Sequence, residues 1–338
     1  MKYLYLPILT CLATLTLCQC GQPAGDQSLF DSVYAEKPIQ LVIETDLSIL
    51  LDKQHGQDWQ PTSVNFEKTA CKTLHLPGKV KPRGVFRKEN CDFPPLKLKF
   101  EPEELAKLGL KEYNSLKLVT HCREDFDYEQ VILKEYLAFR CYNVLTDRSF
   151  RVQLANIRYV DSGKKLPDIE RYGFLIEDDD ELADRLGGHV LEDETGAPTT
   201  VDMPQYKLFV LYQFLIGNTD WSLSNRHNAK LIQPNDLGVP MPFPVPYDFD
   251  FCGMVDAPYA VPAQHLPIKD VKERFFLWKG QQQEDFTETF ALFQSKKQAL
   301  LETCRSFDLL SEENRQEVVD YLESFYELLK SPEQIVGR

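Results

Sequence analysis

The chain has 338 residues, and 43% of them are hydrophobic, so it can bury one large core or two medium-sized ones. Its formal net charge is −14, and the acidic excess is spread along the chain. Attraction to the phosphates of nucleic acids or to anionic lipids is therefore not expected to drive its function.

The first residues have the layout of a bacterial export signal. Lys2 precedes an apolar stretch that is too short to cross a membrane comfortably. Cys20, which glycine follows, resembles the processing site of a lipoprotein, with Cys18 as a rival acceptor. We expect residues 1–20 to be a lipoprotein-type signal peptide and residues 21–37 to be a linker. The protein would then be exported and held in the cell envelope by a lipid anchor, or otherwise be periplasmic or extracellular.

Six cysteines lie beyond this signal: Cys71, Cys91, Cys122, Cys141, Cys252 and Cys304. Their number is even and the chain is predicted to be exported, so one or more disulfides are expected. Burial as small apolar side chains is the alternative for the others. Cys71 and Cys91 enclose a loop of about twenty residues, and closing such a loop would stabilise the fold by roughly 3 kcal/mol. We expect these two cysteines to be bridged.

The first half of the chain is rich in predicted strands. Alternating or β-branched patterns mark six segments: 38–45, 76–88, 94–100, 115–120, 150–160 and 171–177. One helix is predicted among them, over 127–145, where apolar residues recur near helical spacing.

The second half follows an acidic run at 177–188 and is predicted to be mainly helical. Three helices are expected: 203–217, 285–304 and 311–329. The last of them begins at Ser311, a good N-cap, with acidic residues in its first turn. The order predicts a β-rich half with one embedded helix and then a helical half.

Two polar stretches stand out in this second half. GNTDWSLSNRHN, residues 217–228, follows a strongly apolar helix, and YDFDFCG, residues 247–253, sets two acidic residues among aromatic ones. A loop, a short strand and a turn would bring together four side chains: Asp220, Asn225, Asp248 and Asp250. Phosphoryl transfer assisted by Mg²⁺ needs such a set, because one carboxylate handles the attacking hydroxyl while an amide and a second carboxylate hold the metal ion.

The spacing of these residues favours the same chemistry. Asp220 and Asn225 stand five residues apart, like the catalytic Asp and the metal-binding Asn of the protein-kinase catalytic loop. Asp248-Phe249-Asp250 follows where protein kinases carry their metal-binding D-F-G. Each motif alone also fits an ordinary turn or a solvated strand end. Their joint occurrence, in this order after an apolar helix, favours phosphoryl transfer.

Together with the Arg-Gly pair at 83–84, LKLKF at 96–100 and GFLIE at 173–177, the two loops resemble those of the spore coat protein H (CotH) kinases. These are atypical, secreted or surface protein kinases with a reduced bilobal kinase fold. The resemblance covers roughly residues 79–253. It implies ATP, a divalent metal ion (Mg²⁺ or Mn²⁺) and transfer to a protein hydroxyl.

The resemblance also implies a role for each loop residue. Asp220 would be the catalytic Asp, Asn225 a metal ligand, and Asp248 with Asp250 the metal-binding acidic pair. One departure weakens the phosphate-binding part, because bulky residues follow the Arg-Gly pair and no G-x-G-x-x-G loop is present.

The first half offers candidates for binding the ATP phosphates. LKLKF as a strand places Lys97 and Lys99 on one face, although two lysines on a solvated face would show the same pattern. Glu135 is a candidate ion-pair partner for one of these lysines, with Glu129 as a rival. Arg83 could contact phosphate, or it could lie in a surface turn.

We therefore expect an α+β fold, an atypical bilobal protein-kinase-like fold with a β-rich N-lobe over 38–178 and a mainly helical C-lobe over 179–338. The hinge is expected near Glu177 to Glu181. The expected function is ATP- and metal-dependent phosphorylation of Ser or Thr in an exported or surface protein. The alternatives are a non-catalytic surface-binding pseudokinase and a small-molecule or lipid phosphotransferase. The expected partners are ATP and a protein substrate, with no nucleic acid and with membrane contact only through the lipid anchor.

Overall fold

The computed structural model describes residues 27–53, 58–69, 72–191, 200–236, 241–280 and 284–336. The predicted signal peptide and Cys71 lie outside these residues. Within the described ranges, no helix is both long and apolar enough to cross a membrane.

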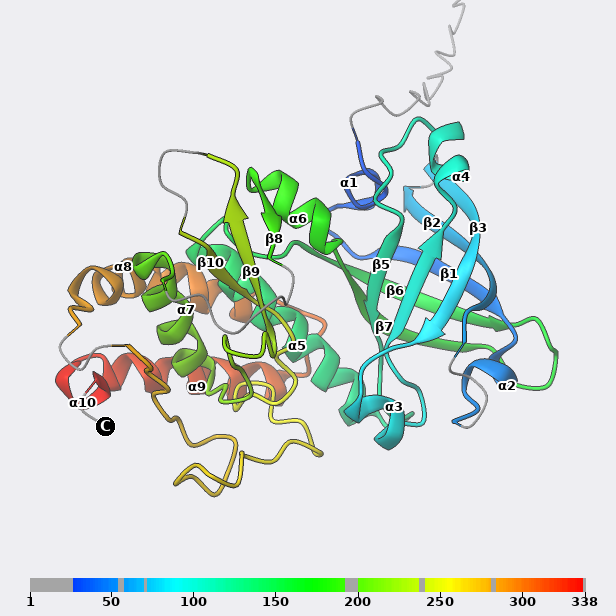
Figure 1. Ribbon diagram of the computed structural model, residues 1–338. Coiled ribbons are helices and arrows are strands. Elements are labelled where there is room, and N and C mark those ends of the chain that lie inside the picture. The colour runs from blue at the N-terminus through cyan, green and yellow to red at the C-terminus, as the bar shows by residue number, and fades with distance from the viewer. Residues whose placement is uncertain are drawn as a thin grey trace, which may run out of the picture.

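A closed barrel of seven strands forms the first part of the molecule, in the order β1-β2-β3-β4-β5-β7-β6 (Figure 1). Its strands are β1 (Ile39–Thr45), β2 (Gln60–Thr69), β3 (Lys72–Pro82), β4 (Leu96–Phe100), β5 (Ser115–Val119), β6 (Val152–Asp161) and β7 (Ile169–Ile176). Neighbouring strands are antiparallel except β1 and β6, which pair in parallel with Leu41 opposite Ile157. Alternate residues of β1 and β4 are buried, and these inward residues fill the barrel with one apolar core.

Four short helices accompany the barrel strands: α1 (Leu29–Val33), α2 (Leu47–Leu50), α3 (Phe86–Asn90) and α4 (Pro102–Lys107). Of these, α3 matters most for the site. It lies between β3 and β4 and buries Arg87, an unusual residue to bury in a short surface helix.

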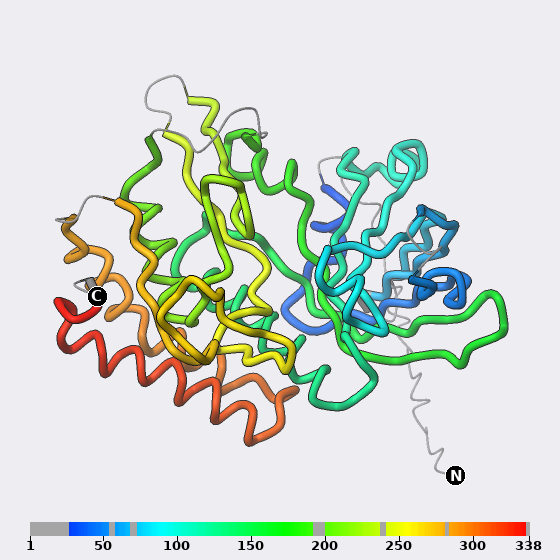
Figure 2. Tube along the Cα trace, turned by 60° about the horizontal axis from the view of Figure 1, so that its bottom comes forward, coloured from blue at the N-terminus to red at the C-terminus, as the bar shows by residue number. Residues whose placement is uncertain are grey.

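The second part of the molecule combines helices with a small sheet. Its helices are α5 (Phe126–Leu145), α6 (Asp179–Arg185), α7 (Met203–Ile216), α8 (Thr287–Arg305), α9 (Glu312–Leu328) and α10 (Glu333–Val336). Its sheet has the order β10-β9-β8, with β8 (Gly188–Val190), β9 (Ala229–Pro234) and β10 (Phe243–Pro246) all antiparallel. Figure 2 shows α8 and α9, orange to red, on the far side of the molecule from the barrel.

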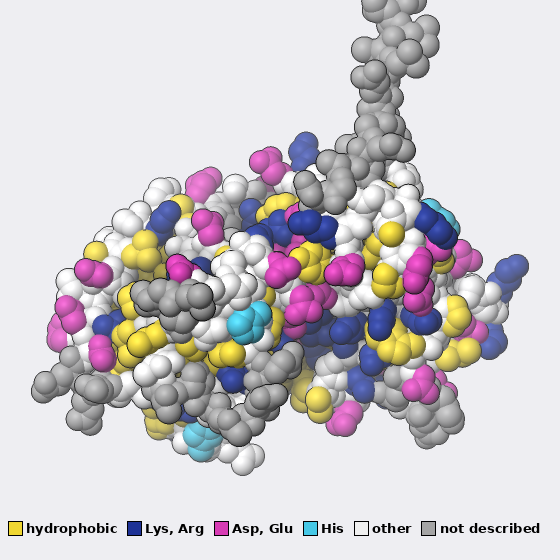
Figure 3. All heavy atoms as spheres, turned by 45° about the horizontal axis from the view of Figure 1, so that its top comes forward, with side chains coloured by type: hydrophobic (Ala, Val, Ile, Leu, Met, Phe, Trp, Pro, Cys, Tyr) yellow, Lys and Arg dark blue, Asp and Glu magenta, His cyan; other side chains and the backbone are white. Residues whose placement is uncertain are grey.

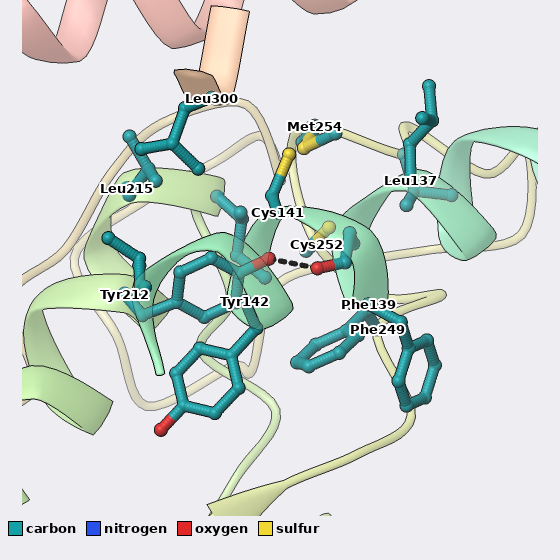
Figure 4. Packing of buried hydrophobic residues seen from close by; sticks show 14 of the residues in the cluster. Leu137, Phe139, Cys141, Tyr142, Tyr212, Leu215, Phe249, Cys252, Met254 and Leu300 are labelled. Atoms are coloured by element: carbon teal, nitrogen blue, oxygen red, sulfur yellow. Dashed lines mark hydrogen bonds between the residues drawn. The ribbon is translucent and has the colours of Figure 1, made fainter. Parts of the chain in front are cut away.

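Helix α5 packs against strands of the barrel and against α8. It is buried on nearly every face, as its almost uniform run of buried residues shows. Phe139 packs edge-to-face against Phe249, with ring centroids 4.7 Å apart, and Tyr212 of α7 donates a hydrogen bond to the carbonyl of Ala138 (Figure 4). These contacts fix the segment around Phe249 against α5. The two acidic residues that flank Phe249 are positioned by the same packing.

The expected bilobal kinase-like fold is wrong. The strands of the first half close into a seven-stranded mixed barrel, and the second half contains a three-stranded sheet as well as helices. The individual elements were largely correct: the strand expected at 38–45 is β1, and the helix expected at 127–145 is α5. Alternation along a strand shows which residues face inward but does not show which strands pair. The closure depends on the parallel pairing of β1 with β6, which are far apart in the sequence.

The expected disulfide between Cys71 and Cys91 is also wrong. Cys91 is bonded to Cys122, which lies 31 positions further along the chain. Among the described residues, Cys141, Cys252 and Cys304 are buried and not bridged.

Candidate active site

The loop that follows α7 is held in place by its own backbone. Gly217 ends the helix in the left-handed region, with φ +67°, and a Cβ there would collide with the hydroxyl of Tyr321. Asn218 Oδ1 then accepts a hydrogen bond from the backbone N–H of Asp220 at 2.9 Å. Ser222 and His227 exchange two backbone hydrogen bonds, of 3.0 and 2.9 Å, which fold the loop back on itself.

This fold-back places two side chains against the Asp220 carboxylate. His227 Nε2 lies 2.8 Å from Oδ1, and Asn228 Nδ2 donates to Oδ2 at 3.0 Å and to the Asp220 carbonyl at 2.8 Å. The Asp220 side chain remains 40% exposed. Both of its oxygens are therefore oriented, yet a molecule from solvent can reach the carboxylate.

Asn225 does not join this arrangement. It lies in the exposed turn between Ser222 and His227 and makes no hydrogen bond to Asp220. Asn228, which the sequence analysis did not select, is buried and has a left-handed φ of +52°, a conformation that Asn tolerates well. Its position directly before the apolar segment AKLI was the available signal, because a residue at the start of a buried strand is held near the core.

Asp248 and Asp250 follow the end of β10, as expected, but they have different surroundings. Asp248 is half-buried, has φ +64°, and accepts no hydrogen bond from the described residues. Asp250 is 4% exposed and accepts a 3.0 Å hydrogen bond from the Tyr259 hydroxyl. Burial first, and then the charges of Asp248 and Asp220, raise the pKa of Asp250 to about 7. The three predicted aspartates therefore share one electrostatic environment.

Glu135 is completely buried in α5, but its partner is neither Lys97 nor Lys99. Arg87 of α3 approaches it instead, with Nη1 3.5 Å from Glu135 Oε2 and 4.0 Å from Asp250 Oδ2. The other terminal nitrogen of Arg87 donates to the carbonyl of Thr120. Burial, and then the charge of Asp250, raise the pKa of Glu135. Glu129, the rival to Glu135, instead accepts a hydrogen bond from the backbone N–H of Tyr172.

We call this set of residues the acidic region: Asp220, Asp248, Asp250 and Glu135. Arg87 is the cation that lies among them. The expectation of a strand lysine paired with Glu135 is corrected by this geometry. Sequence reasoning missed Arg87 because it assigned residues 76–88 to a strand, whereas the strand ends at Pro82 and α3 turns Arg87 inward.

A second charged site lies beside the acidic region. A cavity of about 240 Å³ is lined by residues from β4, β5, α6, β8 and β9 and their connections, and its basic side chains are Lys97, Lys117, Arg226 and Lys230. Figure 3 shows Lys and Arg side chains gathered in the recess where the barrel meets the rest of the chain. We call it the basic cavity. Lys97 lines it, while Lys99 lies on the same strand face but is exposed outside it, so the structure separates the two predicted lysines.

Arg83 lies between the acidic region and the basic cavity. Its charge acts on both Glu135 and Lys117, and its guanidinium makes no hydrogen bond or ion pair with the described residues. The backbone N–H of Arg83 is fixed by the Pro95 carbonyl at 2.7 Å. An unpaired cation at this position suits the expected contact with phosphate.

The donor set for a metal ion is small. No group of three or more His, Cys, Asp or Glu side chains in the described ranges is arranged to hold a metal. Two oxygen donors remain available, because the Asp248 carboxylate and Asn228 Oδ1 accept no hydrogen bond from the described residues. Such a sparse set fits Mg²⁺, which commonly takes one or two protein ligands and completes its shell with water and substrate phosphates.

No family model matches the sequence, and no curated protein matches it.

Proposed function

We propose that the chain is an ATP- and divalent-metal-dependent phosphotransferase that acts on Ser or Thr hydroxyl groups of an exported or surface protein. The observation that carries this proposal is the geometry of Asp220. Its carboxylate is oriented on both oxygens by His227 and Asn228, stays accessible, and lies in the electrostatic environment of Asp248 and Asp250. The proposal rests on the site and not on the fold.

In this proposal Asp220 orients the acceptor hydroxyl and takes its proton. An acidic group can do this only if it is held in one direction and can reach the substrate. The contacts at 2.8 and 3.0 Å provide the first condition, and the 40% exposure of the side chain provides the second.

Asp248 and Asn228 would hold the metal ion, which when bound neutralises charge on the transferred phosphoryl group. Asp248 is the better ligand of the two aspartates that flank Phe249, because its carboxylate has no hydrogen bond or ion pair with the described residues. Asp250 accepts a hydrogen bond from Tyr259 and pairs with Arg87. Burial raises the pKa of its carboxyl to about 7, so the group is partly protonated near neutral pH. We therefore assign Asp250 to positioning the segment and Asp248 to the metal.

The test compares the wild-type protein with Asp220→Asn, with Asp270→Asn as a matched control. Asp270 is an exposed aspartate in the same half of the chain, and among the described residues its carboxylate accepts a hydrogen bond only from the backbone N–H of Lys272. Transfer of labelled γ-phosphate from ATP is measured with Mg²⁺ or Mn²⁺ to casein, to the protein itself and to water. Removing the base should lower the rate by about 10²- to 10⁴-fold.

Nucleotide affinity should change little in Asp220→Asn, because the proposed work of Asp220 is on the acceptor. Asp270→Asn should behave like the wild type. Undiminished transfer in a well-folded Asp220→Asn protein would falsify the assignment. Absence of any transfer or hydrolysis by the wild-type protein would favour a non-catalytic binding role instead.

A further inference from the structure

The basic cavity separates the barrel from the small sheet. Lys97 and Lys117 reach it from neighbouring strands of the barrel, where they stand opposite each other in register. Lys230 reaches it from β9 on the other side, and α6 closes it with the acidic residues of its first turn. A ligand in this cavity would therefore contact both parts of the molecule.

The cavity is lined by the aspartates Asp178, Asp179 and Asp180 as well as by its four cations. Lys117 and Lys230 both pair with the carboxylate of Asp179, which lies 3.0 Å from Lys230 Nζ. The Lys97 ammonium has no ion pair or hydrogen bond with the described residues, and neither has the guanidinium of the neighbouring Arg83. Asp178, the acid next to Asp179, is committed to the Ser115 hydroxyl and to the start of α6.

Lys117 is confined between Asp179 and two aromatic rings. Its side chain is 16% exposed, and its ammonium lies 5.5 Å from the ring centres of both Phe150 and Tyr247. Burial lowers the pKa of Lys117 to about 8 against the opposing pull of Asp179. A buried ammonium with only a shared counter-ion gains stability from any further anion beside it.

The apolar part of the lining is small. Val190, Leu191 and Leu231 provide it, and the other described residues that line the cavity are charged or polar. A purine ring placed here would bury charged groups without pairing them, which is costly. A phosphate group would instead give each lysine a strong, charge-assisted partner.

We propose that the basic cavity binds a multiply charged phosphate group and that Asp179 is the internal counter-ion which such a group displaces. This deepens the proposed function, on which its biological meaning rests, because it assigns the phosphate-recognising site to Lys97, Lys117 and Lys230. Recognition here depends on the phosphates and not on a base. The triphosphate of ATP and a phosphorylated small molecule without a base both carry this chemistry.

The test measures binding of sodium tripolyphosphate, ATP and adenosine by isothermal titration calorimetry, with a chelator present so that no metal ion contributes. We expect tripolyphosphate and ATP to bind with affinities within about threefold of each other and adenosine not to bind. Lys97→Met should weaken tripolyphosphate binding at least tenfold. Lys99→Met removes a lysine two positions along the same strand face, outside the cavity, and should leave the affinity within twofold of wild type.

Asp179→Asn should change the tripolyphosphate affinity in the direction opposite to Lys97→Met. Removing the internal counter-ion should tighten tripolyphosphate binding several-fold, whereas a merely structural Asp179 would give weaker binding or none. Equal effects of Lys97→Met and Lys99→Met would overturn the proposal, as would tight binding of adenosine.

The proposed function can fail separately from this inference. Asp220→Asn should bind tripolyphosphate as the wild type does, because Asp220 does not line the cavity. If Asp220→Asn lost this binding, the phosphate site would lie at Asp220 and the assignment to the basic cavity would be wrong. If tripolyphosphate bound as expected while no phosphoryl transfer was found, the cavity assignment would stand without the enzymatic one.

Discussion

The acidic region and the basic cavity each bring like charges close together, but these charges are balanced in different ways. In the acidic region, Glu135 and Asp250 are almost completely buried, and Arg87 is the cation that lies against both. In the basic cavity, the cations stand at a recess, and Lys97 has no protein partner among the described residues. Buried like charges must be balanced inside the protein, whereas accessible ones can be balanced by a ligand.

The difference predicts where a substitution changes stability and where it changes binding. Removing the balancing ion of a buried pair leaves uncompensated charge and destabilises the fold. Removing an accessible, unpaired cation removes an attraction that only a ligand uses, so the fold is little affected. Arg87 and Arg83 are four positions apart in the sequence, but Arg87 balances buried carboxylates whereas the Arg83 guanidinium has no ion pair with the described residues.

The largest expected effect is that of Arg87→Met on the free energy of unfolding. We expect a loss of about 3–5 kcal/mol, because Glu135 and Asp250 would share a buried site without a cation. Urea unfolding followed by circular dichroism at pH 7 gives this quantity. Arg83→Met is the matched control and should change it by less than about 0.5 kcal/mol. Similar losses in the two variants would contradict the division drawn here.

The next effect concerns the disulfide that supports Arg87. Cys91 closely follows α3, and Cys122 closely follows Thr120, whose carbonyl accepts a hydrogen bond from Arg87. Replacing both cysteines by serine should cost about 3–4 kcal/mol, as expected from closing a loop of this length. Tripolyphosphate affinity should stay within twofold, since the basic cavity does not include this bridge.

Combining this double replacement with Arg87→Met tests whether the bridge acts on the acidic region. The combined loss should be smaller than the sum of the separate losses, because once the bridge is gone Arg87 is held less firmly against its carboxylates. Strict additivity would mean that the disulfide and Arg87 stabilise the fold independently.

Local pattern explains how much of this arrangement could be predicted. The alternation of LKLKF correctly placed Lys97 and Lys99 on one face of β4, and the apolar helix before Gly217 correctly placed the Asp220 loop. Only the pairing of strands decides which of two lysines on one face reaches a cavity. That pairing is set by contacts distant in sequence, so the choice of Lys97 required the structure.

Spacing alone misled in one respect. The five-residue interval selected Asn225, but the two hydrogen bonds between Ser222 and His227 turn Asn225 outward and bring Asn228 to Asp220. Loop conformation determines which asparagine faces the site, and a fixed sequence interval assumes one conformation. Arg87 was missed for a related reason, because a five-residue helix interrupts what alternation indicated to be a strand.

The smallest effect tests the comparison at a third group of charges, around Arg151. This arginine contacts Asp31 at 2.7 Å, Glu177 at 2.9 Å and Glu181 at 2.8 Å, so one cation again serves several carboxylates. Glu181 has a 6% exposed side chain, and its Oε2 is buried with no hydrogen-bond partner in the part of the chain that the structure describes. Burial raises the pKa of Glu181 from 4.5 to about 7 despite Arg151.

A raised carboxyl pKa means that the folded protein binds more protons than the unfolded chain between about pH 4.5 and pH 7. Stability contributed by protonated Glu181 is therefore complete below pH 4.5 and is lost as the pH rises to about 7. Glu181→Gln, which mimics the protonated group, should stabilise the fold by about 1–3 kcal/mol at pH 8 and by almost nothing at pH 4.5. Urea unfolding at the two pH values measures this, and the exposed Glu313→Gln should change neither. Destabilisation by Glu181→Gln at pH 8 would show instead that the ion pair with Arg151 outweighs the cost of burying the Glu181 charge. One arginine shared by several carboxylates would then be enough to stabilise a buried, ionised glutamate.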